Sequence, residues 1–436
     1  MKRVALHNLG CKVNAYETEA MQQMLEENGY EVVPFTQPAD VYIINTCTVT
    51  NIADRKSRQM LHRAKAKNPN ACVVAVGCYV QAAGEKLLQD AAVDLVIGNN
   101  RKKDLIRVLQ EWEQDHKAAE CITDIAADQE YEELTLGRTT EHTRAYLKVQ
   151  DGCNQFCSYC IIPYARGRVR SRKMQDVIKE VERLASEGYQ EIVLTGIHLS
   201  SYGVDFDPCS SLLDLILRVQ EVEGIERIRL GSLEPRIITE EFVSELSKSR
   251  KFCPHFHLSL QSGCDETLKR MNRHYTTGEY FKKCQLIREY FEHPALTTDI
   301  IVGFPQESEA EFEATRAFLE KVSFYETHIF KYSRRQGTKA AVMEGQIPEP
   351  VKAVRSNELL SLNREKSRAF RDYYLGRTQE VLFEEMTEIS GEIYQIGHTK
   401  EYVRAAVKSK NELSNQLRLA RVTGFLTDEI MLAEFV

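Results

Sequence analysis

Short apolar runs alternate with helical periodicity over about the first 100 residues of the chain. The runs "KRVALHNLG", "DVYIINTC", "ACVVAVGC" and "VDLVIGN" have the length and the Val/Ile content of buried strands. Helical patterns separate them, at residues 15–28, at 51–67 and up to about residue 90. Strands that alternate with helices are typical of a parallel sheet covered on both faces. We therefore predict an open, doubly wound α/β domain over residues 1–110.

A second series of strand candidates follows an acidic stretch at 111–138, which has low periodicity and is predicted to be a linker. Helical patterns lie between the members of this series, which are "AYLKVQ", "EIVLTG", "RIRLGS", "HFHLSL", "TTDIIVGF" and "YETHIFKY". Six β/α units fall short of the eight that close a TIM barrel. Residues 139–345 are thus expected to form a partial parallel barrel with an open side for a large substrate.

The last part of the chain changes pattern twice. Residues 346–375 contain one amphipathic helix, at 350–375, that ends at Gly376. Residues 376–436 contain short β runs such as "TQEVLFEEM", "YVRAAVK" and "RLARVTGFL", which predict a small all-β barrel.

Composition narrows the class of protein. The 436 residues are 43% hydrophobic and 28% charged, as in a soluble globular protein, and carry a net charge of −7. No secretory signal is apparent, and no apolar run approaches the roughly 20 residues that span a bilayer. We therefore expect a cytoplasmic protein without a membrane partner. In a reducing compartment, clustered thiols among the 12 cysteines more often hold metal than form disulfides.

Three of these cysteines lie on one short loop, in the spacing C-x3-C-x2-C at Cys153, Cys157 and Cys160. Structural zinc normally takes four ligands, and a plant-type ferredoxin has a different first gap and a fourth thiolate. Three thiolates on a 4Fe-4S cluster leave one iron open to chelate a small molecule. The alternative is three free thiols on a surface loop.

A second set of three cysteines is dispersed through the N-terminal domain. Cys11, Cys47 and Cys78 each lie just beyond the carboxyl end of a predicted parallel strand, at the edge where open α/β sheets bind ligands. Converging thiolates without histidine or carboxylate partners favour an iron–sulfur cluster or zinc. The alternative is three buried core cysteines. Cys72, at the start of its strand, is predicted to be structural.

Polar residues and glycines also gather at the predicted carboxyl ends of the barrel strands, where barrel sites form. They are Thr195, Gly196, Ser232, Glu234, Gln261, Asp299 and Gly303. For each one taken alone, a turn or a cap is an equally good interpretation.

The three-cysteine loop, following a strand at the start of a six-unit β/α series, resembles the radical S-adenosylmethionine superfamily. The resemblance implies that the open iron binds S-adenosylmethionine and that its cleavage gives a 5′-deoxyadenosyl radical. The strand-end residues named above match the cofactor-binding pattern of this superfamily. Tyr159, between two of the cysteines, is a candidate to pack on the adenine; the alternative is a structural aromatic residue.

Both cysteine sets together, ahead of a terminal β domain, resemble the methylthiotransferases over nearly the whole chain. The resemblance implies a second 4Fe-4S cluster on Cys11, Cys47 and Cys78, which receives the sulfur, and a C-terminal TRAM domain. "YSRRQGTKA" (332–340) and "QSGCDETLKRMNRHYT" (261–276) also match stretches of this family. Rival interpretations are a non-enzymatic iron–sulfur RNA-binding protein and a cobalamin-dependent radical methylase, although no D-x-H-x-x-G motif is present.

The stretch "LGCKVNAYETE" resembles the branch that acts on N6-threonylcarbamoyladenosine at position 37 of tRNA. The isopentenyladenosine branch usually has "GCQMN", and the branch that modifies an aspartate of a ribosomal protein has "GCPKN". The expected partner is therefore a tRNA carrying N6-threonylcarbamoyladenosine. The sequence does not identify the sulfur donor or the electron donor.

RNA contacts are expected from basic residues. Arg166, Arg168, Arg170 and Arg172 are spaced two apart, so that on an extended segment they share one face. The helix at 350–375 and the stretch 400–421 are also rich in Lys and Arg, and such residues track phosphates or stack on loop bases. The alternative for each is solvated surface charge.

Overall fold

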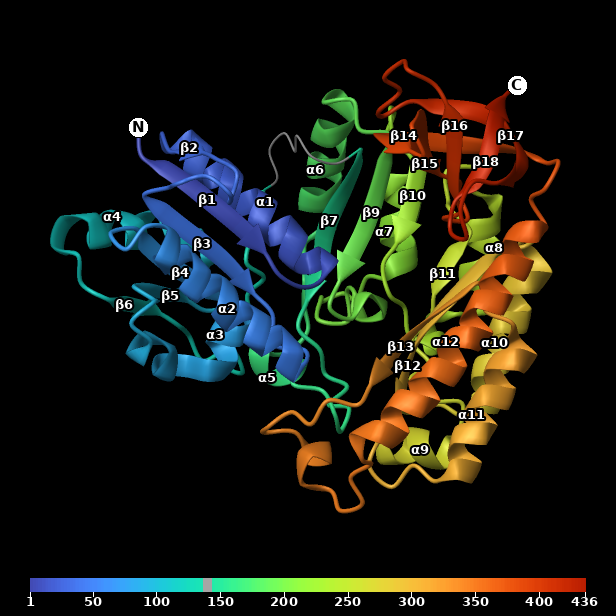
Figure 1. Cartoon of the computed structure of the whole chain (residues 1–436), viewed down its shortest axis with the longest axis horizontal. Helices are drawn as coiled ribbons and strands as arrows, with labels where there is room; N and C mark the ends of the chain where they lie inside the picture. Colours follow the sequence, from blue (N-terminus) through green and yellow to red (C-terminus); the bar gives the residue numbers. More distant parts are fainter. Residues whose placement is uncertain (136–142) are drawn as a thin grey trace.

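The computed structural model describes residues 1–135 and 143–436, and its elements form an N-terminal sheet, a partial barrel and a small closed barrel (Figure 1). The N-terminal sheet has six parallel strands in the order β2-β1-β3-β4-β5-β6. Their bounds are β1 Arg3–Asn8, β2 Glu31–Val32, β3 Val41–Thr46, β4 Cys72–Gly77, β5 Leu95–Ile97 and β6 Ala119–Cys121.

Helices cover both faces of this sheet, which confirms the doubly wound prediction. They are α1 Lys12–Glu27, α2 Asn51–Lys67, α3 Cys78–Ala83 and α4 Leu105–Asp115. Leu25 of α1 and Leu109 of α4 pack on one face of the sheet, and Leu61 of α2 packs on the other. The strands β3 and β4 are buried along their whole length, as expected for a sheet enclosed between two helical layers.

The acidic stretch at 111–138 is more than the linker that its composition predicts. It contains the end of α4 and the edge strand β6, and its Leu134 joins the hydrophobic core of the barrel. The Tyr131 hydroxyl donates to the backbone oxygen of Lys148, and Glu132 is buried. Isolated apolar residues among the acids carry this packing, and such residues give no periodic signal. Residues 136–138, and the predicted start of the barrel at 139, lie outside the described residues.

Six parallel strands form the partial barrel, as predicted. They are β7 Arg144–Asp151, β9 Glu191–Gly196, β10 Arg227–Leu230, β11 His255–His257, β12 Ala295–Val302 and β13 Glu326–Lys331. Ladders join them as β10-β9-β7 and β11-β12-β13, and single bridges from Ile228 to Phe252 and from Leu233 to Leu258 connect the two groups. The short β8, Arg170–Ser171, is antiparallel to the end of β7.

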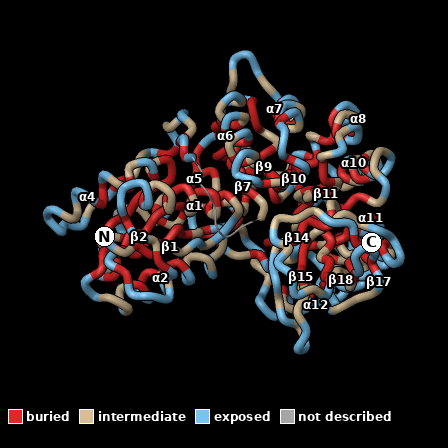
Figure 2. Tube along the Cα trace, turned by 90° about the horizontal axis from the view of Figure 1, so that it is seen from above, coloured by how far each residue is buried: buried red, intermediate tan, exposed pale blue. Residues whose placement is uncertain are grey.

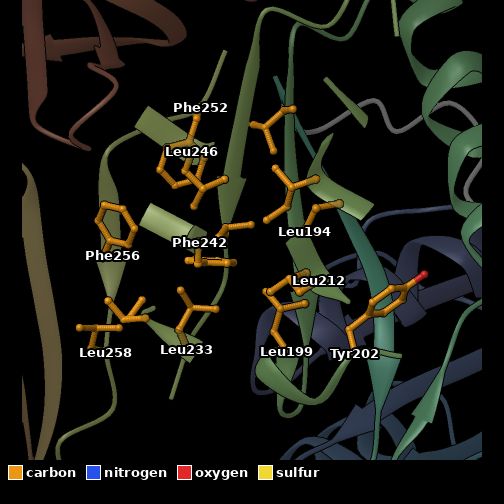
Figure 3. Close-up of a cluster of buried hydrophobic side chains, with 14 of the residues drawn as sticks. Leu194, Leu199, Tyr202, Leu212, Leu233, Phe242, Leu246, Phe252, Phe256 and Leu258 are labelled. Atoms are coloured by element: carbon orange, nitrogen blue, oxygen red, sulfur yellow. The ribbon is translucent and has the colours of Figure 1, made fainter. Parts of the chain in front are cut away.

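Helices pack against one face of these strands and bury the main core. They are α6 Met174–Ser186, α7 Leu212–Val219, α8 Glu240–Lys248, α10 Thr277–Tyr290 and α11 Glu309–Val322, with short α5 Ile162–Arg166 and α9 Asp265–Arg270 in the connections. Figure 3 shows part of this core, where Leu194 of β9 and Phe256 of β11 lie near Phe242 and Leu246 of α8. Buried positions run along β7, β9 and β10 (Figure 2), whereas most of β13, at the edge of the partial barrel, is partly or fully exposed.

The C-terminal residues form the predicted helix and barrel. Helix α12, Glu349–Asp372, runs beside β13 and leads into a closed five-stranded barrel of order β14-β15-β16-β18-β17 (Figure 1). The strands are β14 Thr378–Ile389, β15 Glu392–His398, β16 Arg404–Lys408, β17 Leu417–Phe425 and β18 Met431–Phe435. None of the described helices combines the length and apolarity of a membrane span.

The closed barrel docks on the amino ends of the partial-barrel strands. Arg227 pairs with Glu380 and donates to the backbone oxygen of His398. Arg229 pairs with buried Glu191 and donates to the backbone oxygens of Thr399 and Lys400. The ring of Tyr402 stacks on both His255 and His398, with centroids 4.9 and 4.4 Å apart. These contacts close one end of the partial barrel and leave the carboxyl ends of its strands for chemistry.

This interface predicts a loss of stability in acid. Burial, with Arg144 and Arg229 close by, lowers the pKa of His398, although Glu384 hydrogen-bonds its ring at 2.8 Å. The unfolded chain therefore takes up this proton at a higher pH than the native protein, and stability falls as the pH drops below about 6.5. We expect His398→Gln to weaken this pH dependence, measured by urea unfolding at several pH values.

A matched control is His274→Gln, at an exposed position. An unchanged pH dependence in His398→Gln would show that His398 is not the source of the loss of stability in acid.

Candidate functional site

The three-cysteine loop begins where β7 ends and is fixed by backbone contacts on both sides. Gly152 has φ +70°, and a Cβ there would lie 1.8 Å from the backbone oxygen of Arg168, so the position requires glycine. The backbone N–H of Cys153 donates to Gly167, and that of Ser158 donates to Met271. The side chain of Asn272 donates to the backbone oxygen of Phe156. The loop is thus held in shape between β7 and the segment after α9.

The thiols of this loop lie partly buried beside an arginine. Burial raises the pKa of Cys153 to about 11 and that of Cys160 to about 12, and the Cys157 sulfur acts in the same direction on both. The Arg273 guanidinium donates to the Cys157 sulfur at 3.4 Å and is itself fixed by the Tyr275 hydroxyl at 2.8 Å. A cationic donor aimed at a thiol stabilises the thiolate form that a metal cluster requires.

A buried carboxylate stands next to the same loop. Burial alone raises the pKa of Glu234, but the His198 ring, Arg273 and Arg236 outweigh it and lower the pKa to about 2. The side chain of Gln155, within the loop, donates to this carboxylate at 3.5 Å. Glu234 therefore stays negative and presents an acceptor beside the thiols, a match for an ammonium group. Ser232, two residues earlier, is exposed.

The other strand-end residues divide by environment. Thr195 is buried. At Gly196 the side chain of Gln150 approaches the backbone closely, because a Cβ added there would lie 2.8 Å from the Gln150 side-chain oxygen. Gln261 has φ +73° and pairs through its backbone with Asp299 and Ile301. Thr195 and Gly196 end β9, Gln261 follows β11 and bridges to Ile300, and Asp299 lies within β12.

Two further candidates, Gly303 and Tyr159, lie next to Phe304, the first in the sequence and the second through a ring contact. Gly303 donates its N–H to Glu307, and a Cβ there would lie 2.3 Å from the Lys352 side chain. Tyr159 is half-buried and meets the Phe304 ring edge-on, with centroids 6.5 Å apart. Tyr159 also packs against the small hydrophobic cluster that contains Met271 and Tyr332.

The N-terminal cysteines lie together at the carboxyl edge of their sheet. Cys11 precedes α1, Cys47 follows β3, and Cys78 is the first residue of α3 after β4. A Cβ on Gly10 would lie 3.2 Å from the Cys47 sulfur. Burial raises the pKa of Cys11 and raises that of Cys47 to about 11, and in both cases the Cys78 sulfur adds to the effect. The structure therefore brings these three thiols to one place.

A buried ionic network joins this second set to the barrel, and Arg166 is at its centre. Arg166 Nε donates to the Cys78 sulfur at 3.1 Å, and its Nη atoms donate to Glu17 of α1 at 2.9 and 3.1 Å. The same guanidinium donates to Asp151 at the end of β7 at 3.1 Å. Lys148 bonds both carboxylates, at 2.9 Å for Glu17 and 2.6 Å for Asp151.

Every charge in this network is removed from water. The side chains of Arg166, Glu17, Asp151 and Lys148 are at most 4% exposed. Burial alone raises the pKa of Glu17, but Arg166, Lys102 and Lys148 outweigh it and hold the pKa well below its usual range. Arg166, Lys102 and Lys148 all lie within 3.2 Å of Glu17, and Arg170 lies 4.0 Å from Asp151. Of these cations Arg166 donates to Cys78, and such a donor suits a thiolate or an anionic cluster.

The prediction that the four spaced arginines form an RNA-binding face is wrong for three of them. Arg170 donates to the backbone oxygens of Arg166 and Arg168, and Arg172 pairs with Glu133 and Glu180. Both are buried, as is Arg166, because the segment turns through α5 and β8 instead of running extended. Arg168 is exposed and lies 4.5 Å above the Phe156 ring.

The stretch 332–340, "YSRRQGTKA", connects the two cysteine loops. The Arg335 guanidinium donates at 2.6 Å to the hydroxyl of Thr48, the residue after Cys47, and at 2.7 Å to Asp54 of α2. Five residues later, the Ala340 N–H donates to the backbone oxygen of Ser158 at 2.7 Å, between Cys157 and Cys160. Together with Arg166, this stretch links the segment after Cys47 and the three-cysteine loop, so the two sets of thiols are tied to each other through the barrel.

The residues present fit iron–sulfur clusters at both places. Each set offers three soft sulfur ligands, and each has an arginine that donates to one sulfur, Arg166 to Cys78 and Arg273 to Cys157. Hydrogen bonds to the sulfurs tune such clusters and stabilise their negative charge. Sequence reasoning missed Arg273, although it lies in the quoted stretch "KRMNRHYT". A buried arginine leaves no periodic signal by which it stands out.

The network predicts that Arg166 is essential for stability. Arg166→Met removes the partner of two buried carboxylates, and we expect a loss of roughly 3–5 kcal/mol in the free energy of unfolding. The single tryptophan, Trp112 in α4, reports unfolding of this part in urea. The control Arg168→Met, at an exposed site, is expected to lose about 0–1 kcal/mol. Equal losses in the two variants would refute the role assigned to the network.

Comparisons with known proteins agree with this division of the chain. Residues 3–98 match the family described as uncharacterized protein family UPF0004, and residues 147–319 match the radical SAM superfamily. Among solved structures, the radical S-adenosylmethionine methyltransferase TsrM from Kitasatospora setae is similar, with a TM-score of 0.59 and 17% identity. The similarity covers 78% of this chain and 77% of that chain. At this identity the likeness shows the shared fold alone.

Curated relatives are similar over nearly the full length. A threonylcarbamoyladenosine tRNA methylthiotransferase MtaB from Bacillus subtilis is 40% identical over 96% of this chain and 93% of its own. The MtaB protein of Aquifex aeolicus is 40% identical over 90% and 95%. A tRNA-2-methylthio-N(6)-dimethylallyladenosine synthase from Clostridium botulinum is 35% identical over 98% and 92%. The chain therefore belongs to the radical S-adenosylmethionine methylthiotransferase family, whose members use a 4Fe-4S cluster and S-adenosylmethionine.

Proposed function

We propose that this protein transfers a methylthio group to C2 of N6-threonylcarbamoyladenosine at position 37 of the tRNA anticodon loop. S-adenosylmethionine is both the methyl donor and the radical source. The proposal is supported by the contacts that link the two three-thiol sets, made by Arg166 and by the stretch 332–340. The names of the MtaB relatives, which are 40% identical, support the choice of nucleoside.

The proposal assigns one 4Fe-4S cluster to Cys153, Cys157 and Cys160 and a second to Cys11, Cys47 and Cys78. The C2 hydrogen of the adenine is unactivated, so acid–base catalysis cannot abstract it. When bound, the clusters and S-adenosylmethionine would supply the radical that removes this hydrogen and the sulfur that replaces it. Glu234 is placed to bind the ammonium group of S-adenosylmethionine, because it stays ionised beside the loop. Arg273 donates to the Cys157 sulfur and Arg166 to the Cys78 sulfur, contacts that would stabilise the negative charge of a bound cluster.

The remaining cofactor contacts are assigned by position. Gly196 and Gly303 offer backbone at the carboxyl ends of β9 and β12, while Thr195, Gln261 and Tyr159 present side chains near the same ends. Asp299, which the sequence also suggested, lies within β12 and is not assigned to the cofactor here. Ser232 is exposed beside Glu234 and is assigned to the same region. Their role in this proposal is to orient the cofactor against the loop.

Exposed cations on the closed barrel are better candidates for RNA contacts than the buried arginines. On β17, Arg418 and Arg421 are exposed, and Leu419 beside them is 56% exposed. Lys408 and Lys410 are also exposed, and Lys408 pairs with Glu392. In contrast, Lys352, Arg355 and Arg371 of α12 are buried, so that half of its positive charge is unavailable to phosphates. A tRNA substrate agrees with the cytoplasmic location expected from the sequence.

The cysteine assignment predicts two distinct failures. Cys47→Ser is expected to keep the cleavage of S-adenosylmethionine to 5′-deoxyadenosine and to lose methylthiolation, whereas Cys153→Ser is expected to lose both. Mass analysis of the products and of the tRNA nucleosides measures the two activities in anaerobically reconstituted enzyme. The matched control is Cys209→Ser, at an exposed thiol.

Full methylthiolation by Cys47→Ser would remove the second cluster from the proposal. A product that carries an isopentenyl group in place of the threonylcarbamoyl group would move the enzyme to the branch of its Clostridium relative.

The exposed arginines of β17 predict a change in salt dependence. We expect Arg418→Glu/Arg421→Glu to weaken tRNA binding and to reduce the slope of log K against log salt by about 2, one unit per lost phosphate contact. Fluorescence anisotropy of labelled tRNA at several salt concentrations measures the slope. The double control Lys179→Glu/Lys282→Glu reverses the same charge at exposed sites on α6 and α10. Equal slopes of log K against log salt in the two double variants would show that the RNA does not bind at these arginines of β17.

A further inference from the structure

Three potential metal ligands lie side by side on neighbouring strands of the partial barrel. His257 ends β11, Asp299 lies within β12, and His328 lies within β13. Asp299 is the register partner of His328, and His257 is the register partner of Thr297, two residues before Asp299. Residues two apart point to the same face of a strand, so all three side chains share one face.

That face is the one turned away from the helical layer. On β12 the alternate residues Leu296 and Ile300 join the main core with Tyr280 of α10 and Phe318 of α11. Asp299 therefore points to the inner side of the barrel. Its side chain is 27% exposed and that of His257 is 12% exposed, while His328 is exposed. The group is thus accessible from the side on which the barrel sites of this fold form.

The ligand atoms of the three residues are close enough to meet at one ion. One nitrogen of each histidine and one oxygen of Asp299 all lie within 4.8 Å of one another. His257 Nε2 is 3.3 Å from Asp299 Oδ2, and the His257 and His328 rings stack with centroids 5.6 Å apart. Two imidazoles and one carboxylate are the donor set of mononuclear sites that keep open positions.

A second layer of contacts fixes the orientation of His257. Its Nδ1 lies 3.0 Å from the Thr297 hydroxyl oxygen, which in turn is 3.4 Å from Nε2 of His255. Nδ1–H can donate to this hydroxyl while the hydroxyl donates to His255. Nε2 of His257 is then left with its lone pair toward Asp299 and His328. Metal-binding histidines are commonly held by such a bond from the other ring nitrogen.

The site is continuous with the three-cysteine loop. Arg273, which donates to the Cys157 sulfur, also donates to the backbone oxygen of Ser259 at 3.3 Å, and Ser259 follows His257 by two residues. The donors of the triad are nitrogen and oxygen, however, whereas those of the loop are sulfur. The two sites therefore select different metals.

We propose that His257, Asp299 and His328 bind one divalent transition-metal ion of the zinc class, apart from both sets of thiols. Three protein ligands leave at least one coordination position, which faces the inside of the barrel and is open to water or to an oxygen donor such as a carboxylate. The proposal does not depend on the nucleoside assigned above, because it follows from the triad alone. It also gives Asp299 a role different from the S-adenosylmethionine contact expected from its strand-end position.

The test uses zinc bound to the anaerobically reconstituted holoenzyme, after dialysis against zinc of buffered concentration. Zinc per chain is measured by elemental analysis, and its ligands by X-ray absorption at the zinc edge, where iron does not contribute. We expect one zinc per chain with nitrogen and oxygen ligands at about 2.0–2.2 Å. Asp299→Asn and His328→Gln are expected to weaken zinc binding at least about tenfold, with iron content and S-adenosylmethionine binding kept.

The matched control is His62→Gln, which breaks a surface pair with Asp90 of 2.8 Å. It is expected to leave zinc binding unchanged. Three results would overturn the proposal: no retained zinc, zinc with sulfur ligands at about 2.3 Å, or zinc binding that survives in both triad variants. Loss of S-adenosylmethionine binding in Asp299→Asn with zinc retained would restore the cofactor role and likewise reject the metal site.

Discussion

The buried guanidinium of Arg166 is the contact on which the arrangement of the two halves depends. It bonds a carboxylate of α1, a carboxylate at the end of β7 and the sulfur of Cys78 at once. None of these groups has access to water, so each relies on the others for compensation. The position of α1 against β7 is therefore set by charge as well as by packing, and with it the position of one cysteine set relative to the other.

The chemistry explains why such a network is retained. Replacing a whole buried ion-pair network by apolar residues is often neutral or stabilising, although removing one partner from it is not, so stability alone does not explain why the network exists. A cationic donor beside a thiol has a further use, because it favours the thiolate that binds iron. Arg273 repeats the arrangement at Cys157, from a different element of the barrel. Each set of three thiols thus receives a cationic donor from a residue distant in sequence from its first cysteine.

Local patterns in the sequence predicted the strands and the thiols well. Strands buried between helices give continuous apolar runs, so the sequence predicts the six barrel strands and four of the six strands of the N-terminal sheet, and it places the cysteines after strand ends at one edge. The short edge strands β2 and β6 give no such run and were not predicted. The failures involve charged residues that fold inward. Arg166, Arg170 and Arg172 look like a basic face until α5 and β8 turn the chain, and the acidic stretch hides Leu134. The triad of His257, Asp299 and His328 depends on strand register, which no local pattern fixes.

The central claim of this account is that two linked sets of three thiols each hold a 4Fe-4S cluster. Its most direct measurement is the iron and acid-labile sulfide content of the purified, anaerobically reconstituted protein, together with its Mössbauer spectrum. Two 4Fe-4S clusters require about eight irons and eight sulfides per chain, all in cubane form. Iron sufficient for a single cluster, or zinc held by either set of thiols, would contradict the account.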